Sequence, residues 1–172
     1  MTENEKKKTH LPASRPESGL SVRGRQTPAS DVISDLKCRE LIRAAREMLK
    51  YSYVPYSHFH VGAALMTKAG KIYRGCNIEN ASYGATNCAE RTAFFKAVSE
   101  GEREFLAIAI VGGHEGRVED FCPPCGICRQ VMAEFCDLDN FYVILSRSEE
   151  DYWVYPLSEI LPMAFTPHDL EV

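Results

Sequence analysis

Apolar residues recur every three or four positions over residues 34–53 and change to strand-like runs further along the chain. The first pattern predicts an amphipathic helix, with Ser34 or Asp35 available to cap its start. Pro55 ends the helical pattern, because a proline pushes the residue before it out of the helical conformation. The runs FHVGAALM and KIYRGCNIE that follow predict two strands joined by a short turn, which is a β-hairpin.

The second half of the chain alternates helix-like and strand-like segments. CAERTAFFKAVSEG predicts a helix with Gly101 just past its end, and CGICRQVMAEFC predicts another helix. The apolar run FLAIAIVGG is typical of a strand covered on both faces. NFYVILS predicts a further strand, and DYWVYPLSEILP predicts a last strand and a helical turn. This alternation indicates a layered α/β domain with parallel neighbours among its central strands.

Residues 1–30 differ in composition from the rest of the chain. They mix Lys, Ser, Pro, Thr, Gly and Arg with almost no large apolar side chains, so they cannot bury enough surface to offset the entropy lost on ordering. We predict a disordered tail over 1–30 and one folded domain over 31–172. The run Lys6-Lys7-Lys8 is compatible with a localisation or anion-binding patch, but simple solvation is the more ordinary interpretation.

Length, composition and charge narrow the classes of function. The chain has 172 residues, 45% of them hydrophobic and 26% charged, which is the profile of a soluble globular protein. No apolar run approaches the roughly 20 residues of a membrane span, and the start shows no secretory signal. We therefore expect no membrane partner and a cytoplasmic location. Residues 1–30 carry a net charge of +3 and the remaining residues −7, which argues against nucleic-acid binding.

Seven cysteines without an export signal favour metal binding or catalysis over a disulfide framework. Cys88 stands two positions before Glu90, and 37 positions after Cys88 the chain reads Pro124-Cys125-x-x-Cys128. Two cysteines three positions apart at a helix start place both thiols on one face, and Cys88 is the natural third ligand. A catalytic Zn²⁺ keeps three protein ligands and one open position for water, and Glu90 is placed to take that water's proton.

Three thiolates would give a zinc site a formal charge of −1, so a positive group is needed nearby. The amino ends of the two helices each act as about half a positive charge. Arg91 and Arg129 closely follow ligands, and we predict that at least one of them donates to a thiolate sulfur. Arg91 is the stronger candidate of the two. The alternative is that both arginines face solvent.

The other cysteines and two histidines have more ordinary interpretations. Cys122 lies three positions before Cys125 and could close a four-cysteine structural zinc site, but Pro123-Pro124 is expected to turn it away from the cluster. His58 and His60 share one face of a strand, yet three cysteines already suffice for zinc, so a structural or substrate-rim role is favoured. The remaining cysteines, expected to be buried and inert, are Cys38, Cys76 and Cys136.

The cysteine and glutamate pattern is the signature of zinc-dependent deaminases, in which the glutamate moves protons and is not a ligand. The segments FHVGAAL, GCNIENASYGATNCAERTA, PPCGICRQ and LPMAF occur in the order and spacing of the small cytidine deaminases with three cysteine ligands. This resemblance runs from about residue 35 to 170. It implies a three-layer α-β-α fold with a mixed five-stranded sheet, one Zn²⁺ per subunit and a homotetramer. It also implies hydrolytic deamination of cytidine and 2′-deoxycytidine to uridine and 2′-deoxyuridine plus ammonia, within pyrimidine salvage.

The resemblance assigns roles to individual residues as well. The cysteine cluster corresponds to the zinc ligands and Glu90 to the proton shuttle. The implied substrate positions are Asn77 and Glu79 at the ribose hydroxyls, Phe59 and Ala89 beside the pyrimidine, and Tyr83 and Phe165 at a neighbouring subunit's site. For the aromatics, ordinary core packing is the alternative. Many relatives have Pro in place of His60 and Gly in place of Thr166, departures that bear on the base side of the site and on the path of the last segment.

Three other functions are compatible with a zinc site of this kind. Deaminases of polynucleotide cytosine typically have a histidine as the first ligand and a basic groove, whereas this chain has Cys88 and an acidic folded part. A deaminase of a cytosine-bearing antibiotic is closer in chemistry, although the pair Asn77 and Glu79 argues against it. A non-catalytic zinc-binding module is disfavoured because Glu90 and all three ligands are present.

Overall fold

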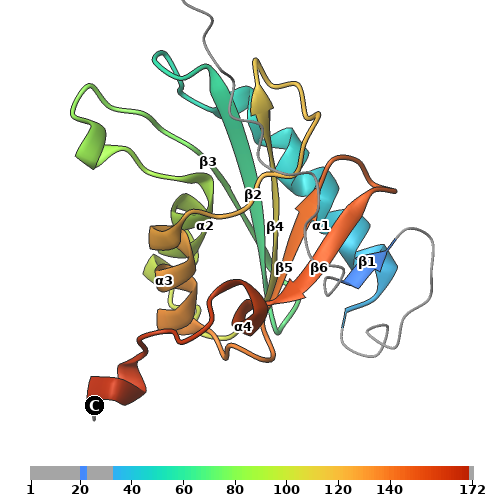
Figure 1. The fold of residues 1–172 in the computed structure, drawn as a ribbon, viewed down its shortest axis with the longest axis vertical. Coiled ribbons are helices and arrows are strands. Elements are labelled where there is room, and N and C mark those ends of the chain that lie inside the picture. Colours follow the sequence, from blue (N-terminus) through green and yellow to red (C-terminus); the bar gives the residue numbers. More distant parts are fainter. Residues whose placement is uncertain (1–19, 23–32, 171–172) are drawn as a thin grey trace, which may run out of the picture.

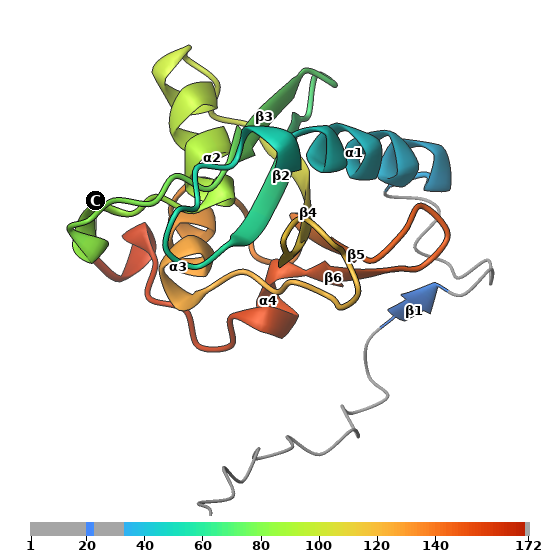
Figure 2. The same cartoon turned by 90° about the horizontal axis from the view of Figure 1, so that it is seen from above.

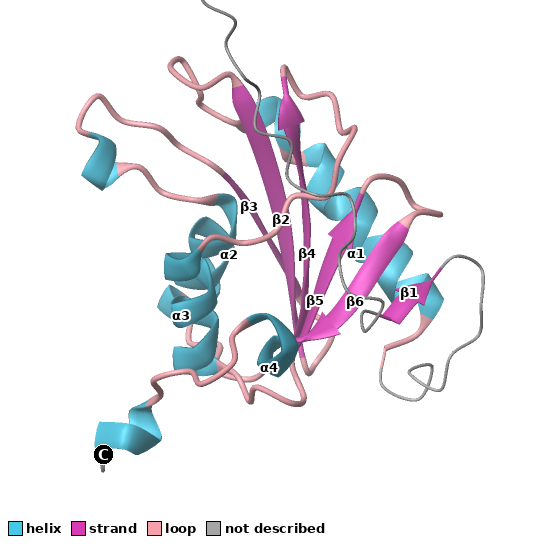
Figure 3. Ribbon diagram, in the orientation of Figure 1, coloured by secondary structure: helices cyan, strands magenta, loops and turns pink. Residues whose placement is uncertain are grey.

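The computed structural model describes residues 20–22 and 33–170. They form one mixed sheet with the strand order β1-β6-β5-β4-β2-β3 and helices on both faces (Figures 1 and 3). The strands are β1 (Leu20–Val22), β2 (Phe59–Thr67), β3 (Ile72–Cys76), β4 (Phe105–His114), β5 (Tyr142–Ser146) and β6 (Tyr152–Pro156). The helices are α1 (Asp35–Glu47), α2 (Ala89–Ser99), α3 (Gly126–Phe135) and α4 (Leu157–Ile160), with the 3₁₀ turns η2 (Leu49–Tyr51), η3 (Tyr83–Ala85) and η4 (Pro167–Leu170). The predicted order of elements from α1 to α4 is confirmed.

The sheet combines one parallel pair of strands with antiparallel pairs. Strands β2 and β3 form the predicted hairpin, and β2 also pairs antiparallel with β4. Strands β4 and β5 are parallel, with α3 between them in the chain, and β5 and β6 are antiparallel. Strand β4 is almost wholly buried, as its continuous apolar run predicts for a strand covered on both faces.

Helices cover the two faces of the sheet, and the sheet divides the core into two clusters. Figure 2 shows α1 on one side and α2, α3 and α4 on the other. The cluster under α1 includes Leu41, Ile42 and Ala45 packed against β2 and β4 residues, and all three side chains are fully buried. The opposite cluster joins α2 and α3 to the sheet around Phe94 and Met132. The three-layer α-β-α prediction is therefore confirmed.

Helix α1 starts where the sequence predicts it. The side chain of Ser34 accepts a hydrogen bond from the backbone N–H of Lys37 at 3.4 Å and so caps the helix. Packing against the sheet is close, because a Cβ added to Gly62 would lie 2.0 Å from the carbonyl oxygen of Ala45. The small residue in β2 thus lets the helix approach the strand.

Most of the predicted tail, residues 1–30, lies outside the described residues. The exception is β1, which pairs antiparallel with β6 and adds a sixth strand to the five that the resemblance implies. In this register Leu20 lies opposite Val154 and Val22 opposite Tyr152. The tail and the domain boundary at residue 31 remain predictions. No helix in the described ranges is long and apolar enough to cross a membrane.

Candidate metal centre and active site

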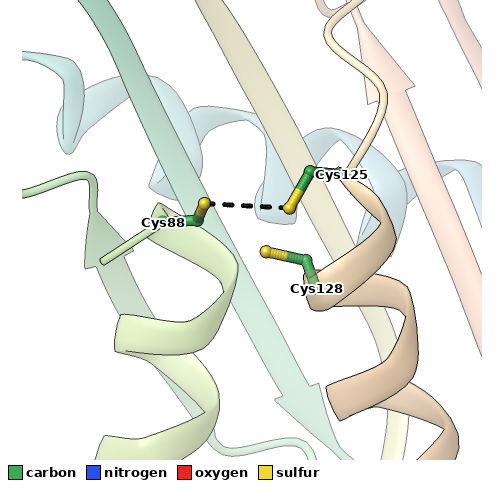
Figure 4. Close-up of side chains that lie close together, drawn as sticks. All are labelled: Cys88, Cys125 and Cys128. Carbon is green, nitrogen blue, oxygen red and sulfur yellow. Dashed lines mark hydrogen bonds between the residues drawn. The ribbon is translucent and has the colours of Figure 1, made fainter. Parts of the chain in front are cut away.

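Three cysteine thiols converge where two helices begin. Cys88 occupies the N-cap position of α2, Cys125 occupies that of α3, and Cys128 lies in the first turn of α3. Their Sγ atoms all lie within 4.8 Å of one another, and Sγ of Cys88 is 3.9 Å from Sγ of Cys125 (Figure 4). The positive ends of both helix dipoles therefore meet near the sulfurs.

The geometry of this cluster fits a zinc ion. Tetrahedral Zn²⁺ with Zn–S bonds near 2.3 Å requires sulfurs about 3.8 Å apart, which agrees with the Cys88–Cys125 separation of 3.9 Å. Cys128 is buried, Cys88 is half-buried and Cys125 is exposed, so the cluster is open on one side. Three thiol ligands and an accessible side match a catalytic site with a fourth position for water.

Cys122 is not a member of the metal-binding group that the described residues form. Its Sγ lies under β4, 2.9 Å from the point where a Cβ on Gly112 would sit. Burial raises the pKa of the Cys122 thiol to about 12, so the group stays protonated at neutral pH. The four-cysteine structural site therefore receives no support, in line with the expectation that Pro123-Pro124 turns this thiol away.

The other cysteines lie in the protein interior. Cys38 and Cys76 are buried, and Cys136 is half-buried. Burial raises the pKa of all three thiols, to about 11 for Cys38. Cys38 and Cys76 are thus buried as the sequence predicts, whereas Cys136 is only partly enclosed. Protonated thiols are poor nucleophiles and poor metal ligands.

Glu90 projects from the first turn of α2 and is only 4% exposed. Burial is the main reason that its pKa is raised to about 7, and the negative charge of Cys88 adds to the effect. A hydrogen bond from the residue's own backbone N–H opposes the rise. A buried carboxyl group with a pKa near neutrality can take up and release a proton readily, which is what general acid–base chemistry requires.

Arg91 lies against the thiols. Its Nη2 atom donates to Sγ of Cys88 at 3.6 Å and to the carbonyl oxygen of Thr86 at 2.9 Å. The pKa of Cys88 is lowered, first by the hydrogen bond from the Cys128 thiol and next by Arg91. The Nε atom of Arg91 is buried without a hydrogen-bond partner among the described residues. This geometry is the one expected of a group that offsets thiolate charge.

Arg129, the second candidate for charge compensation, donates to backbone carbonyl oxygens. Its Nε atom donates to the carbonyl oxygen of Pro124 at 2.8 Å, and its Nη1 atom donates to that of Ile160 at 2.7 Å. In the described structure the guanidinium thus spans two backbone carbonyls and has no hydrogen bond to a thiol. Spacing alone could not reveal this, because Ile160 stands 31 positions further along the chain.

Asn77 and Glu79 have a structural use that the sequence does not reveal. The Asn77 side-chain oxygen accepts from the Val61 N–H at 2.8 Å, and its amide donates to the carbonyl oxygen of Phe59 at 2.8 Å. One carboxylate oxygen of Glu79 accepts from the backbone N–H groups of Tyr56 and Ser57. Both residues therefore fix the start of β2.

The predicted aromatic residues lie on the surface of this chain. Phe59 is 40% exposed, Phe165 58% and Tyr83 74%, so core packing does not explain them. Tyr83 lies on η3, where it contacts Tyr56 edge to face with ring centroids 5.8 Å apart. Tyr83 and Glu79 help to line a hollow of about 370 Å³. Phe165 belongs to the C-terminal segment, which extends from the body in Figure 1. Neither Tyr83 nor Phe165 belongs to the thiol cluster.

The remaining predicted positions have local partners. Ala89 is fully buried at the start of α2. A ring nitrogen of His60, Nδ1, is hydrogen-bonded to the carbonyl oxygen of Leu49 at 3.0 Å, so His60 supports the backbone next to β2. His58 lies 4.0 Å from the carboxylate of Glu115 and is not part of the metal cluster. Thr166 donates from its backbone N–H and its hydroxyl to Asp169, which holds η4 together.

Comparisons with known proteins agree with this site. A family model described as the cytidine and deoxycytidylate deaminase zinc-binding region matches residues 37–144. A cytidine deaminase of Halalkalibacterium halodurans is 54% identical over 130 residues, which cover 76% of this chain and 95% of that protein. A probable cytidine deaminase of Dictyostelium discoideum is 44% identical over 129 residues, which cover 75% of this chain and 84% of that protein.

Solved structures agree as well. A crystal structure of cytidine deaminase from Burkholderia pseudomallei superposes with a TM-score of 0.67 at 48% identity, covering 73% of this chain and 97% of that one. The crystal structure of cytidine deaminase from Mycobacterium tuberculosis superposes with a TM-score of 0.62 at 38% identity, covering 73% of this chain and 94% of that one. The cysteine cluster, the sheet and these matches lead to one conclusion: the chain belongs to the cytidine and deoxycytidylate deaminase family.

Proposed function

We propose that this protein deaminates cytidine and 2′-deoxycytidine hydrolytically, yielding uridine or 2′-deoxyuridine and ammonia. The observation that carries the proposal is the convergence of three thiols at two helix starts, with the buried carboxyl group of Glu90 two residues after one of them. Named relatives at 42–54% identity are cytidine deaminases, which supports the same reaction for this chain.

Cys88, Cys125 and Cys128 would hold one Zn²⁺ per subunit. Bound there, the ion would supply an acidified water as nucleophile and a positive charge at the reacting centre. Arg91, which donates to the Cys88 sulfur at 3.6 Å, would withdraw negative charge from the thiolate and keep the site electrophilic. The two helix dipoles act in the same direction.

Glu90 would move the protons of the reaction. Its carboxylate accepts a proton from the water that adds to C4 of the cytosine ring and delivers it to N3. The same group then takes the second proton of the added oxygen as the C4 carbonyl forms and passes it to the departing amine, so one carboxyl group acts as base and as acid in turn. Its burial excludes bulk water and brings its pKa to about 7, where both forms are accessible.

Asn77 and Glu79 would bind the ribose hydroxyls while they hold β2. An amide group has two donor hydrogens and two acceptor lone pairs, and the fold uses one of each on Asn77. Glu79 accepts both of its backbone hydrogen bonds at Oε2, so these two bonds do not occupy Oε1. Phe59 and the backbone of Ala89 would contact the pyrimidine ring.

The exposed aromatics support a homotetramer in which subunits complete each other's sites. Tyr83 and Phe165 are largely exposed in this chain, and burial of such rings against another copy would gain free energy. We place the enzyme in the cytoplasm, within pyrimidine salvage. Free nucleosides, and not nucleic acid or membrane, are its partners in this proposal.

The reaction is tested by following the loss of cytidine's ultraviolet absorbance with purified protein. Parallel reactions contain 2′-deoxycytidine, single-stranded DNA, or cytidine after zinc has been removed with a chelator. We expect turnover of both nucleosides, none of DNA, and loss of activity without zinc that returns when zinc is added. Turnover of DNA but not of nucleosides, or undiminished activity without zinc, would contradict the proposal. A protein with zinc bound and no nucleoside turnover would favour another cytosine-bearing substrate.

A further inference from the structure

The last part of the chain makes few contacts with the body. Residues 161–170, here called the C-terminal arm, follow α4 and end in η4 (Figure 1). Phe165 is 58% exposed, and Met163 is fully exposed with a positive φ of 55°. Leu161 packs against the core at the start of the arm, but apolar packing does not hold Met163 or Phe165, so polar contacts near Phe165 matter for its position.

A glutamine of α3 supplies that contact. The Nε2 atom of Gln130 donates to the carbonyl oxygen of Phe165 at 2.7 Å. Among the described residues this is the one hydrogen bond from the body to arm residues 162–170; the bonds from Thr166 to Asp169 stay within the arm. Gln130 therefore fixes the backbone that carries the Phe165 ring.

The preceding residue holds both the ligand loop and the start of the arm. Arg129 donates from Nε to the carbonyl oxygen of Pro124, directly before Cys125, and from Nη1 to the carbonyl oxygen of Ile160, directly before the arm. Because both donors lie on one rigid plane, the guanidinium constrains the distance between these two carbonyl oxygens. The guanidinium is half-buried, which strengthens these hydrogen bonds relative to exposed ones.

We propose that Arg129 and Gln130 are positioning residues that couple the metal-binding loop to the C-terminal arm. Arg129 holds the segment Pro124–Cys128, which includes the first turn of α3, in the shape that brings its two thiols toward Cys88. Gln130 places Phe165 for contact with substrate in a neighbouring subunit's site. The second role rests on the proposed function, whereas the first can be measured without any enzymatic activity.

Gln130→Met tests the arm contact, because methionine has a similar length and no donor. We expect faster amide hydrogen exchange in residues 161–170 and a KM for cytidine raised about fivefold, the value of one hydrogen bond, with kcat and zinc content unchanged. The matched control is Gln26→Met, which changes the chain's other glutamine. An unchanged rate of amide hydrogen exchange in the arm would show that Gln130 does not hold it in place. A fall in kcat with unchanged KM would overturn its role in substrate binding.

Arg129→Lys tests the loop contact, because lysine keeps the charge but cannot span two carbonyls. We expect zinc transfer to a chromophoric chelator to become about tenfold faster, as for other losses of groups that orient metal ligands. Arg43→Lys is the matched control, since Arg43 pairs with Glu149 on the surface. Zinc release as slow as in the wild type would overturn the role of Arg129. Absence of deaminase activity in the wild type would refute the proposed function but leave both structural readouts valid.

Discussion

At the scale of single residues, the thiols of this protein occupy contrasting electrostatic surroundings. Cys88 is half-buried at a helix start, and hydrogen bonds from the Cys128 thiol and Arg91 lower its pKa. Cys122 lies nearby under β4, where burial and the negative charges of Glu90 and Cys88 raise its pKa to about 12. Two neighbouring cysteines therefore differ in their readiness to lose a proton, and only the first is suited to bind a metal ion.

Alkylation of the zinc-free protein should reveal this difference. At pH 7 the lowered pKa keeps Cys88 largely as thiolate, so iodoacetamide should modify it, whereas Cys122 remains a thiol and should react only in strongly alkaline solution. As the pH falls, Cys88 gains its proton and its reactivity should decline. Peptide mass spectrometry measures both sites, and saturating zinc should protect Cys88. Equal modification of both cysteines at pH 7 is the outcome that this electrostatic difference forbids.

Residue roles could be predicted from sequence where the partners are local. Cys125 and Cys128 share a helix turn, and the Cys-x-Glu pair begins another helix, so spacing alone indicates a metal site with a neighbouring acid. The contact of Arg129 with Ile160 and those of Asn77 with the β2 backbone join segments that are far apart in sequence. Such contacts depend on how segments pack, and residue spacing does not record that.

At the scale of secondary structure, two glycines set how closely helices approach the sheet. A Cβ on Gly75 in β3 would lie 2.3 Å from the carbonyl oxygen of Ala89 and 2.6 Å from the backbone nitrogen of Ala93. Both atoms belong to α2, the helix that presents Cys88 and Glu90. Gly62 has the same function toward α1, which carries no site residue. Helix position and site geometry are thus linked through Gly75.

Gly75→Ala should destabilise the protein and disturb the metal site. Overpacking of this kind costs about 1–3 kcal/mol, measured as the free energy of unfolding in urea. Because α2 must move, zinc affinity should fall as well. Gly62→Ala should lower stability by a similar amount with zinc affinity unchanged. Gly84→Ala is the control, because an added Cβ there meets no atom within 4 Å. Normal stability and zinc affinity in the Gly75 variant would show that α2 does not depend on this contact.

The elements themselves were predicted well because each has a clear local signal. Helical spacing in α1 and the continuous apolar run of β4 identify both, and the buried faces match the pattern. Strand β1 was not predicted, because its residues lie in a polar segment. It forms only by pairing with β6, about 130 positions further along the chain, as in the register of Leu20 with Val154. Long-range strand pairing leaves no periodic signal in such a short segment.

At the scale of the whole molecule, the exposed apolar side chains are the feature that bears on the proposed assembly. Several large apolar side chains are exposed on η3, on the first turn of α3 and on the C-terminal arm, among them Tyr83, Ile127, Met163 and Phe165. Exposed apolar groups of this size are typical of interfaces between subunits. A homotetramer would cover them and bring Phe165 to another subunit's substrate.

Sedimentation analysis tests this assembly. The wild type should behave as a tetramer, and Phe165→Ala should weaken the assembly and raise KM, because the ring contributes to both. Leu36→Ala serves as the control, since Leu36 is 72% exposed on α1, away from these segments. A wild-type protein that stays monomeric at the concentrations of the activity assay, and is fully active there, contradicts the shared-site proposal.

The most direct test of the central claim is the activity of Glu90→Gln. Glutamine matches the shape of the buried glutamate but cannot carry the proton, so the thiols should bind zinc as before while kcat for cytidine falls at least about 10²- to 10⁴-fold. Zinc content and kcat are measured on the same preparation. Retained zinc with this loss of turnover is the predicted result. Near-normal turnover would contradict the assignment of Glu90 and, with it, the proposed mechanism.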